Sequence, residues 1–228
     1  GNYAGDNMNV KMAVQMAEDD DIEVKYVVAN DDVASAPKAV KEQRHGIAGG
    51  FFMWKVGGAR AAKGGSLDDV IASAQNVVNR TKSICVGLEP CVIPALGHSN
   101  FKIEDGTMEF GVGHHGEAGT KVEKLKSASE MAQEMAETIL NDFDFEEGKE
   151  VAVMLSGLGA TPVMELYVLY DEVEKVLAKA GHKVWKTYIG NYVTSLDMNG
   201  ASLTIVDLDD EIKELLSEPA VPIGMKNY

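Results

Sequence analysis

The chain has 228 residues, which is enough for one large domain or two small ones, each with a buried core. Its 36 acidic and 21 basic side chains give a formal charge of −15, which repels phosphate backbones and anionic membrane surfaces and argues against nucleic acid as a partner. No apolar run approaches the roughly 20 residues that a membrane span needs, and no targeting signal opens the chain. We therefore expect a cytoplasmic protein.

The first part of the chain predicts helices and one strand. Methionines at 8, 12 and 16 follow helical spacing, so residues 7–18 predict a helix with a methionine-rich inner face. Residues 24–29 are rich in valine and predict a strand. Residues 46–62 predict a helix whose apolar residues recur near helical spacing: Ile47, Phe51, Trp54 and Ala61. Ser66 is expected to cap a further helix, 67–79, with Asp69 in its first turn.

The pattern changes after Arg80, where a loop-rich segment covers residues 85–127. Further on, Thr161 is the expected N-cap of a helix that starts at Pro162. Cys85 and Cys91 have no matching Cys or His pair and are interpreted as reduced packing residues. The remaining expected strands are 83–88, 108–112, 151–155, 184–189 and 201–208, and the remaining helices are 128–141 and 209–216.

Strands that alternate with helices predict an α/β architecture with mixed sheets flanked by helices. We place a domain boundary near residue 80. Residues 1–80 are then the C-terminal part of a first, incomplete α/β domain, and residues 81–228 form a second α/β domain.

Two glycine-rich stretches are candidate sites. Residues 156–161 resemble a phosphate-binding turn, but the glycine spacing fails at Pro162, so an ordinary strand-to-helix turn is favoured. His114 and His115 are adjacent, and neighbouring side chains in an extended segment point to opposite faces, so we predict no metal site there. The histidines are surrounded by four glycines, which leave room for a small ligand: Gly111, Gly113, Gly116 and Gly119. A solvated turn with two incidental histidines is the simpler alternative.

Asp6 is a further candidate, because it lies in a polar, glycine-containing stretch just before the Met8 helix. The commoner role of an aspartate in this position is to cap the helix or to act as an acidic residue in its first turn.

Taken together, several segments resemble one family, the dihydroxyacetone kinase substrate-binding subunit (DhaK) of the phosphotransferase-coupled bacterial enzyme. They occur in the family's order: Asn2-Tyr-x-Gly-Asp6, Asp31-Asp-Val33, Met108-Glu-Phe-Gly-Val-Gly-His-His-Gly-Glu-x-Gly119, Leu158-Gly-Ala-Thr-Pro162, Glu165-Leu-Tyr167 and Thr194-Ser-Leu-Asp-Met198.

The resemblance implies roles for particular residues. His115 matches the histidine that holds dihydroxyacetone covalently as a hemiaminal, Asp6 matches the substrate-binding aspartate that draws off the hydroxyl proton, and Gly1 occupies a substrate-contacting position. Glu117 or a backbone carbonyl is expected to fix the tautomer of His115. No cofactor is expected on this chain. ADP or ATP with magnesium is implied on a nucleotide-binding, DhaL-like partner subunit, and a homodimer is implied.

Three departures from the family pattern leave alternatives open. The family's GGGSGHEP region, expected to precede Asn2, is not present, so the resemblance implies that this chain alone does not catalyse. Gly1 stands where other members have lysine, and Ala118 replaces a proline. The alternatives are a kinase for a related tetrose, a non-catalytic ligand sensor that acts as a transcriptional co-activator, and an α/β domain without carbonyl chemistry.

Overall fold

A six-stranded sheet forms the centre of the protein in the computed structural model, which describes residues 1–99, 101–115, 117–144 and 148–222. The strand order is β3-β2-β1-β6-β4-β5, and every neighbouring pair is antiparallel except the parallel pair β4–β5. The strands are β1 (Thr81–Glu89), β2 (Thr107–Phe110), β3 (Lys121–Lys124), β4 (Glu150–Gly157), β5 (Lys183–Gly190) and β6 (Asn199–Asp207).

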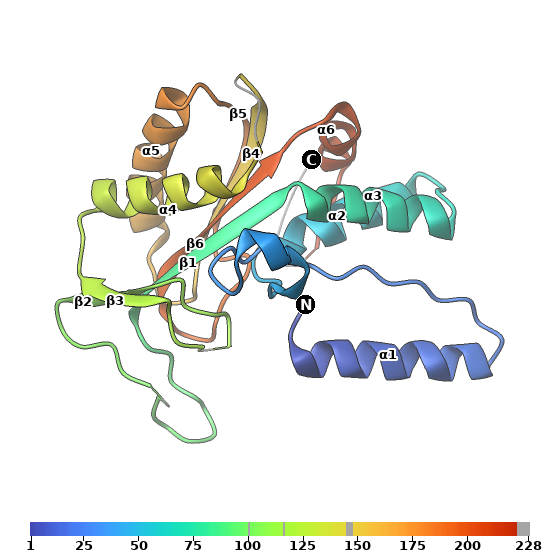
Figure 1. Cartoon of the computed structure of the whole chain (residues 1–228), viewed down its shortest axis with the longest axis horizontal. Coiled ribbons are helices and arrows are strands. Elements are labelled where there is room, and N and C mark those ends of the chain that lie inside the picture. Colours follow the sequence, from blue (N-terminus) through green and yellow to red (C-terminus); the bar gives the residue numbers. More distant parts are fainter. Residues whose placement is uncertain (100, 116, 145–147, 223–228) are drawn as a thin grey trace.

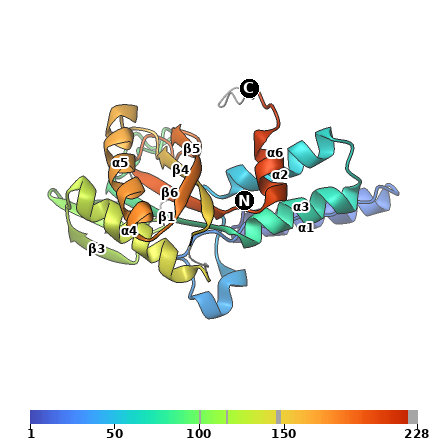
Figure 2. The same ribbon diagram turned by 90° about the horizontal axis from the view of Figure 1, so that it is seen from above.

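Helices cover both faces of this sheet (Figures 1 and 2). Because successive strand side chains point to opposite faces, the apolar run of β4 serves two cores. Val151, Val153 and Leu155 pack with α4 (Ala128–Asp142) and α5 (Val163–Lys179). Ala152 and Met154 pack with α2 (Gly50–Ala62), α3 (Leu67–Asn79) and α6 (Asp210–Ser217). The predicted mixed α/β class with flanking helices is confirmed.

The helices before residue 80 share a core with the strands after it. Phe52 and Val56 of α2 and Val77 of α3 are buried together with Val206 of β6. The division into domains at residue 80 stays a prediction. Cys85 and Cys91 are buried free thiols, as expected. In the described ranges, no helix is both long enough and apolar enough to span a bilayer.

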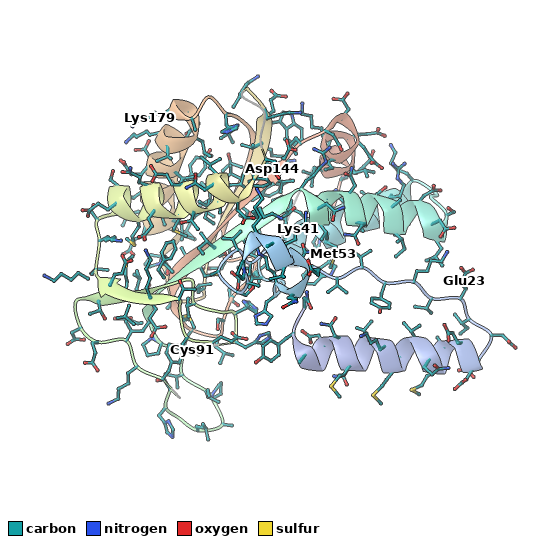
Figure 3. All side chains as sticks on the ribbon, viewed as in Figure 1. Glu23, Lys41, Met53, Cys91, Asp144 and Lys179 are labelled. Atoms are coloured by element: carbon teal, nitrogen blue, oxygen red, sulfur yellow. The ribbon has the colours of Figure 1, made fainter. Side chains whose placement is uncertain are left out.

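The first helix, α1 (Ala4–Asp19), differs from the prediction in the direction of its methionines. It has no buried residue, and Met8, Met12 and Met16 are 65%, 61% and 66% exposed. Figure 3 shows the sulfur atoms of α1 on the side turned away from the sheet. Helical spacing identifies a common face but does not say what that face meets, so the predicted inner face was wrong.

The valine-rich run at residues 24–29 is also not a strand; it is an extended segment that leads back from α1 (Figure 1). A strand needs a neighbour that accepts and donates its backbone hydrogen bonds. In the described structure this region reaches the sheet only at an isolated bridge between Asp32 and Ser83. The β-branched residues are therefore extended without being part of the sheet.

Two further local predictions were wrong because tertiary contacts outweigh local preference. Trp54 of α2 is 61% exposed, and the buried face is formed by Phe52 and Val56 instead. Pro162, not Thr161, is the N-cap of α5. The Thr161 hydroxyl instead accepts from the Gly200 backbone N–H at 2.8 Å. The short strand β3 lies inside the segment that was expected to be loop-rich.

Prediction for the cap of α3. Ser66 and Asp69 form the expected capping box, in which the Ser66 hydroxyl accepts from the Asp69 backbone N–H. Replacing Ser66 with alanine removes this acceptor, so Ser66→Ala should lower the free energy of unfolding by about 1 kcal/mol. Urea unfolding measures the loss. Ser66→Thr is the control, because it keeps a capping oxygen, and equal losses in both variants would contradict the capping role.

Candidate functional site

The loop that carries the two histidines begins directly after β2, and glycine determines its path. The Gly111 N–H donates to the Cys85 carbonyl at 2.7 Å, and Gly111 has a φ of +75°. A Cβ atom at Gly113 would lie 2.1 Å from Glu117 Oε2, so only glycine lets Glu117 fold back over the loop. Gly116 lies outside the described residues.

Glu117 holds His115 by two contacts. Its Oε2 accepts from the His115 backbone N–H at 2.8 Å, and its Oε1 lies 3.3 Å from His115 Nδ1. Burial works to raise the pKa of Glu117, but backbone hydrogen bonds from Glu117 itself and from His115 lower it overall. A carboxylate beside Nδ1 favours the tautomer with the proton on that nitrogen, which leaves the Nε2 lone pair free. The His115 side chain is 56% exposed.

Two rings contact His115, those of Tyr3 and His114, and a third, that of His45, contacts Tyr3. The Tyr3 ring centroid is 5.2 Å from that of His115 and 5.2 Å from that of His45, so Tyr3 lies between the two imidazoles. The His114 ring is 5.4 Å from His115. Burial and the neighbouring His115 lower the pKa of His114 and so favour its neutral form. His45 was not predicted, because nothing in the sequence connects it with the loop after β2.

The predicted site residues Gly1 and Asp6 lie together at the start of α1. A Cβ atom on Gly1 would lie 2.9 Å from Asp6 Oδ2. The buried Asn2 fixes this terminus, because its side-chain amide donates to the Arg44 carbonyl at 2.7 Å. Tyr3 follows directly and reaches His115. Within the described residues no hydrogen bond joins Asp6 to His115, so the structure brings the two predicted residues to one region without direct contact.

Two buried carboxylates connect this region to the sheet. Asp31 accepts from the backbone N–H groups of Ile47 and Gly49 at 3.1 and 2.7 Å. Asp32 Oδ1 accepts from the Ala34 N–H at 3.0 Å. Burial raises the pKa of Asp32 to about 7, and the negative charges of Asp31 and Glu117 add to the shift.

The geometry supports neither metal binding nor phosphate binding at the glycine turn after β4. Over the described ranges, no three His, Cys, Asp or Glu side chains gather in a way that could hold a metal ion. In the glycine turn after β4, the Ser156 hydroxyl accepts from the backbone N–H groups of Tyr192 and Val193 at 3.0 and 3.1 Å. These contacts give that turn a structural role.

The fold and the site define an α/β protein that presents a carboxylate-held imidazole on a glycine-rich loop. A sequence model described as the Dak1 domain matches residues 1–223. The chain belongs to the Dak1 domain family.

Curated relatives agree with this assignment. The chain is 40% identical over 210 residues to the dihydroxyacetone-binding subunit DhaK of a PTS-dependent dihydroxyacetone kinase from Listeria innocua, covering 92% of this chain and 64% of the relative. It is 38% identical to a D-erythrulose kinase of Mycolicibacterium smegmatis, covering 96% of this chain and 38% of that protein. The chain thus spans less than two thirds of the length of these relatives.

A solved structure has the same fold. The structure titled dihydroxyacetone kinase operon co-activator Dha-DhaQ superimposes with a TM-score of 0.88 at 30% identity, covering 96% of this chain and 68% of the other. Kinase subunits and a co-activator are therefore both similar to this chain.

Prediction for Asp32. A carboxyl group whose pKa is raised on folding binds more protons in the folded state, so the stability it contributes is present at low pH and is lost as pH rises toward about 7. At about 1.4 kcal/mol per pKa unit, the free energy of unfolding should fall on the order of 2 kcal/mol between pH 5 and 8.

Asp32→Asn should remove most of this loss, because asparagine does not titrate. Urea unfolding at several pH values measures it. Asp19→Asn, at the far end of α1, is the control and should behave like the wild type. An unchanged pH dependence in Asp32→Asn would contradict the raised pKa.

Proposed function

We propose that this chain is the substrate-holding part of a dihydroxyacetone kinase and that His115 binds the ketose covalently. The observation that carries the proposal is the contact between Glu117 Oε1 and His115 Nδ1 at 3.3 Å. It leaves Nε2 as the nitrogen with a free lone pair, on a side chain that is exposed to an incoming ligand.

The covalent step is an addition without a leaving group. Nε2 of His115 attacks the carbonyl carbon of dihydroxyacetone, and the π electron pair moves to oxygen, which takes up a proton. Nδ1 gives up its proton toward Glu117, which keeps the ring neutral, and the product is a hemiaminal. Glycerol has no carbonyl group and cannot react. Covalent capture thus selects ketoses and aldehydes over polyols by their carbonyl group.

Asp6 is proposed to take the proton from the terminal hydroxyl of the bound ketose as the phosphoryl group arrives. It lies beside Gly1 at the start of α1, next to Tyr3, whose ring contacts His115. The phosphoryl donor is a nucleotide with magnesium on a partner subunit. Phosphoryl transfer depends mostly on positioning and charge, so a holding subunit and a nucleotide-carrying subunit can divide the work. A homodimer remains part of the proposal.

Two alternatives have their own support. The solved structure reported above is titled a co-activator, which favours a ligand sensor built on the same fold. The D-erythrulose kinase relative favours a four-carbon ketose as the substrate.

Prediction for His115. Native mass spectrometry with dihydroxyacetone should show one adduct with the full mass of the ketose, because an imidazole adduct cannot lose water to form an imine. His115→Ala should abolish the adduct. His114→Ala is the matched control and should keep it. If the adduct persists in His115→Ala, the assignment is wrong; erythrulose in place of dihydroxyacetone tests the tetrose alternative.

Prediction for Asp6. In the complete subunit with its nucleotide-carrying partner, Asp6→Asn should keep the ketose adduct while turnover falls by about a hundredfold or more, because asparagine cannot accept a proton. A coupled assay of the phosphorylated product measures turnover, and Asp19→Asn is the control. Normal turnover in Asp6→Asn would remove Asp6 from this role. Adduct formation without any turnover in the wild type would favour the sensor.

A further inference from the structure

A polar cleft of about 420 Å³ lies between the start of β1, the end of α4 and the 3₁₀ helix η1 (Lys38–Gln43). This volume falls in the range of small-molecule sites, roughly 300–1,000 Å³. Lys41 and Asp144, two of its lining residues, are labelled in Figure 3. None of the lining residues belongs to the imidazole site. The charged lining residues are Lys38, Lys41, Arg80, Lys82, Asp142, Asp144 and Asp207.

Each carboxylate of the cleft already has a cation. The buried Arg44 guanidinium binds both oxygens of Asp142, at 2.6 and 2.7 Å. Lys38 pairs with Asp144 at 2.7 Å. Arg80 pairs with Asp207. Each carboxylate is thus paired with an arginine or with Lys38, although the charge of Asp142 also acts on Lys82 and Asp207 Oδ1 accepts no hydrogen bond within the described residues.

The third pair joins Arg80 and Asp207 at 2.6 Å. Two lysines are then left over, Lys41 and Lys82. Lys41 is exposed, and no carboxylate in the described part of the chain pairs with it. Lys82 is only 5% exposed, and its ammonium group donates to the Thr81 carbonyl at 3.1 Å and lies 5.8 Å from the Phe143 ring centroid.

Lys82 is costly as it stands. Burial lowers the pKa of its ammonium group, Asp142 opposes the shift, and the charges of Arg44 and Lys41 add to the lowering. A buried charge normally has a counter-charge, and a single carbonyl at 3.1 Å is a weak substitute. Two lysines without an ion-pair partner beside a cleft are notable, because acidic side chains outnumber basic ones in this chain and its formal charge is −15.

We propose that this cleft binds a small phosphomonoester, with its phosphate group between Lys41 and Lys82. A phosphomonoester carries about −1.5 to −2 charges at pH 7, which matches the two unpaired lysines. Its several acceptor oxygens suit the ammonium donors, and a cleft of about 420 Å³ leaves room for a short carbon chain beyond the phosphate. The site is separate from the proposed ketose site and does not depend on the chemistry of His115.

The test is isothermal titration calorimetry of the whole chain at fixed ionic strength, with inorganic phosphate, glycerol 3-phosphate and glycerol as probes. We expect glycerol 3-phosphate to bind saturably at one site, at least as tightly as inorganic phosphate, and glycerol not to bind. Lys41→Ala and Lys82→Met should each weaken phosphate binding about tenfold or more. Lys11→Ala, on exposed α1, changes the charge equally and should bind like the wild type.

The variants separate a site from general charge attraction. Lys41 is exposed, so Lys41→Ala tests binding in a chain whose core is untouched, and Lys82→Met replaces the buried stem by one of similar shape. Wild-type affinity in Lys41→Ala would overturn the proposal. Equal weakening in Lys11→Ala would overturn it too, since binding would then follow net charge, and so would saturable binding of glycerol. Thermal unfolding of Lys82→Met confirms that any loss of binding is not a loss of fold.

Discussion

The buried carboxylate of Asp31 holds the N-terminal part of the chain against the sheet. It accepts hydrogen bonds from the backbone N–H groups of Ile47 and Gly49, just before α2 begins. The backbone carbonyl of Asp31 accepts from the Ser83 N–H at 2.7 Å, so the same residue also binds to β1. Burial raises its pKa, and these hydrogen bonds offset part of that cost. Two further contacts act with this anchor: the Asn2 amide donates to the Arg44 carbonyl, and the His45 carbonyl accepts from the Asp32 N–H. Together they place Tyr3 and His45 beside the loop that carries His115.

The candidate site depends on this placement, because its parts come from three separate stretches of the chain. Tyr3 precedes α1, His45 precedes α2, and His115 follows β2, yet their rings lie within contact distance. The position of the His115 ring itself needs little: a glycine where Glu117 folds back, and a carboxylate at Nδ1. What the fold adds is the Tyr3 ring, which comes from the stretch before α1 and lies 5.2 Å from the His115 ring.

Sequence reasoning was reliable where local chemistry decides the outcome. Ser66 and Asp69 form their cap because both partners lie within four residues, and β4 is buried on both faces, as its continuous apolar run indicated. It was unreliable where a distant partner decides. The methionines of α1 have the right periodicity for burial but are exposed in the described structure. Residues 24–29 lack a strand partner, although Val27 and Ala29 pack against Met53, Ala74 and Val78. His45 could not be predicted, because contacts between distant residues place it: its carbonyl accepts from the Asp32 N–H and its N–H donates to the Ser35 hydroxyl. His115 and Glu117 were found from a motif, and of the two partners expected for the second nitrogen of His115, a carbonyl or Glu117, the structure shows Glu117.

Arg44 connects the two polar regions on either side of the Asp31 anchor. Its carbonyl accepts from the Asn2 amide beside Tyr3, and its guanidinium binds Asp142, which lines the polar cleft. Arg44 is 1% exposed, so neither end can move far without the other or without breaking a buried ion pair, which is costly. The same ion pair lies close to Lys82, because the charges of Asp142 and Arg44 act in opposite directions on the pKa of its ammonium group. Because the Arg44 carbonyl accepts from the Asn2 amide, one buried residue contacts both the edge of the cleft and the stretch that carries Tyr3.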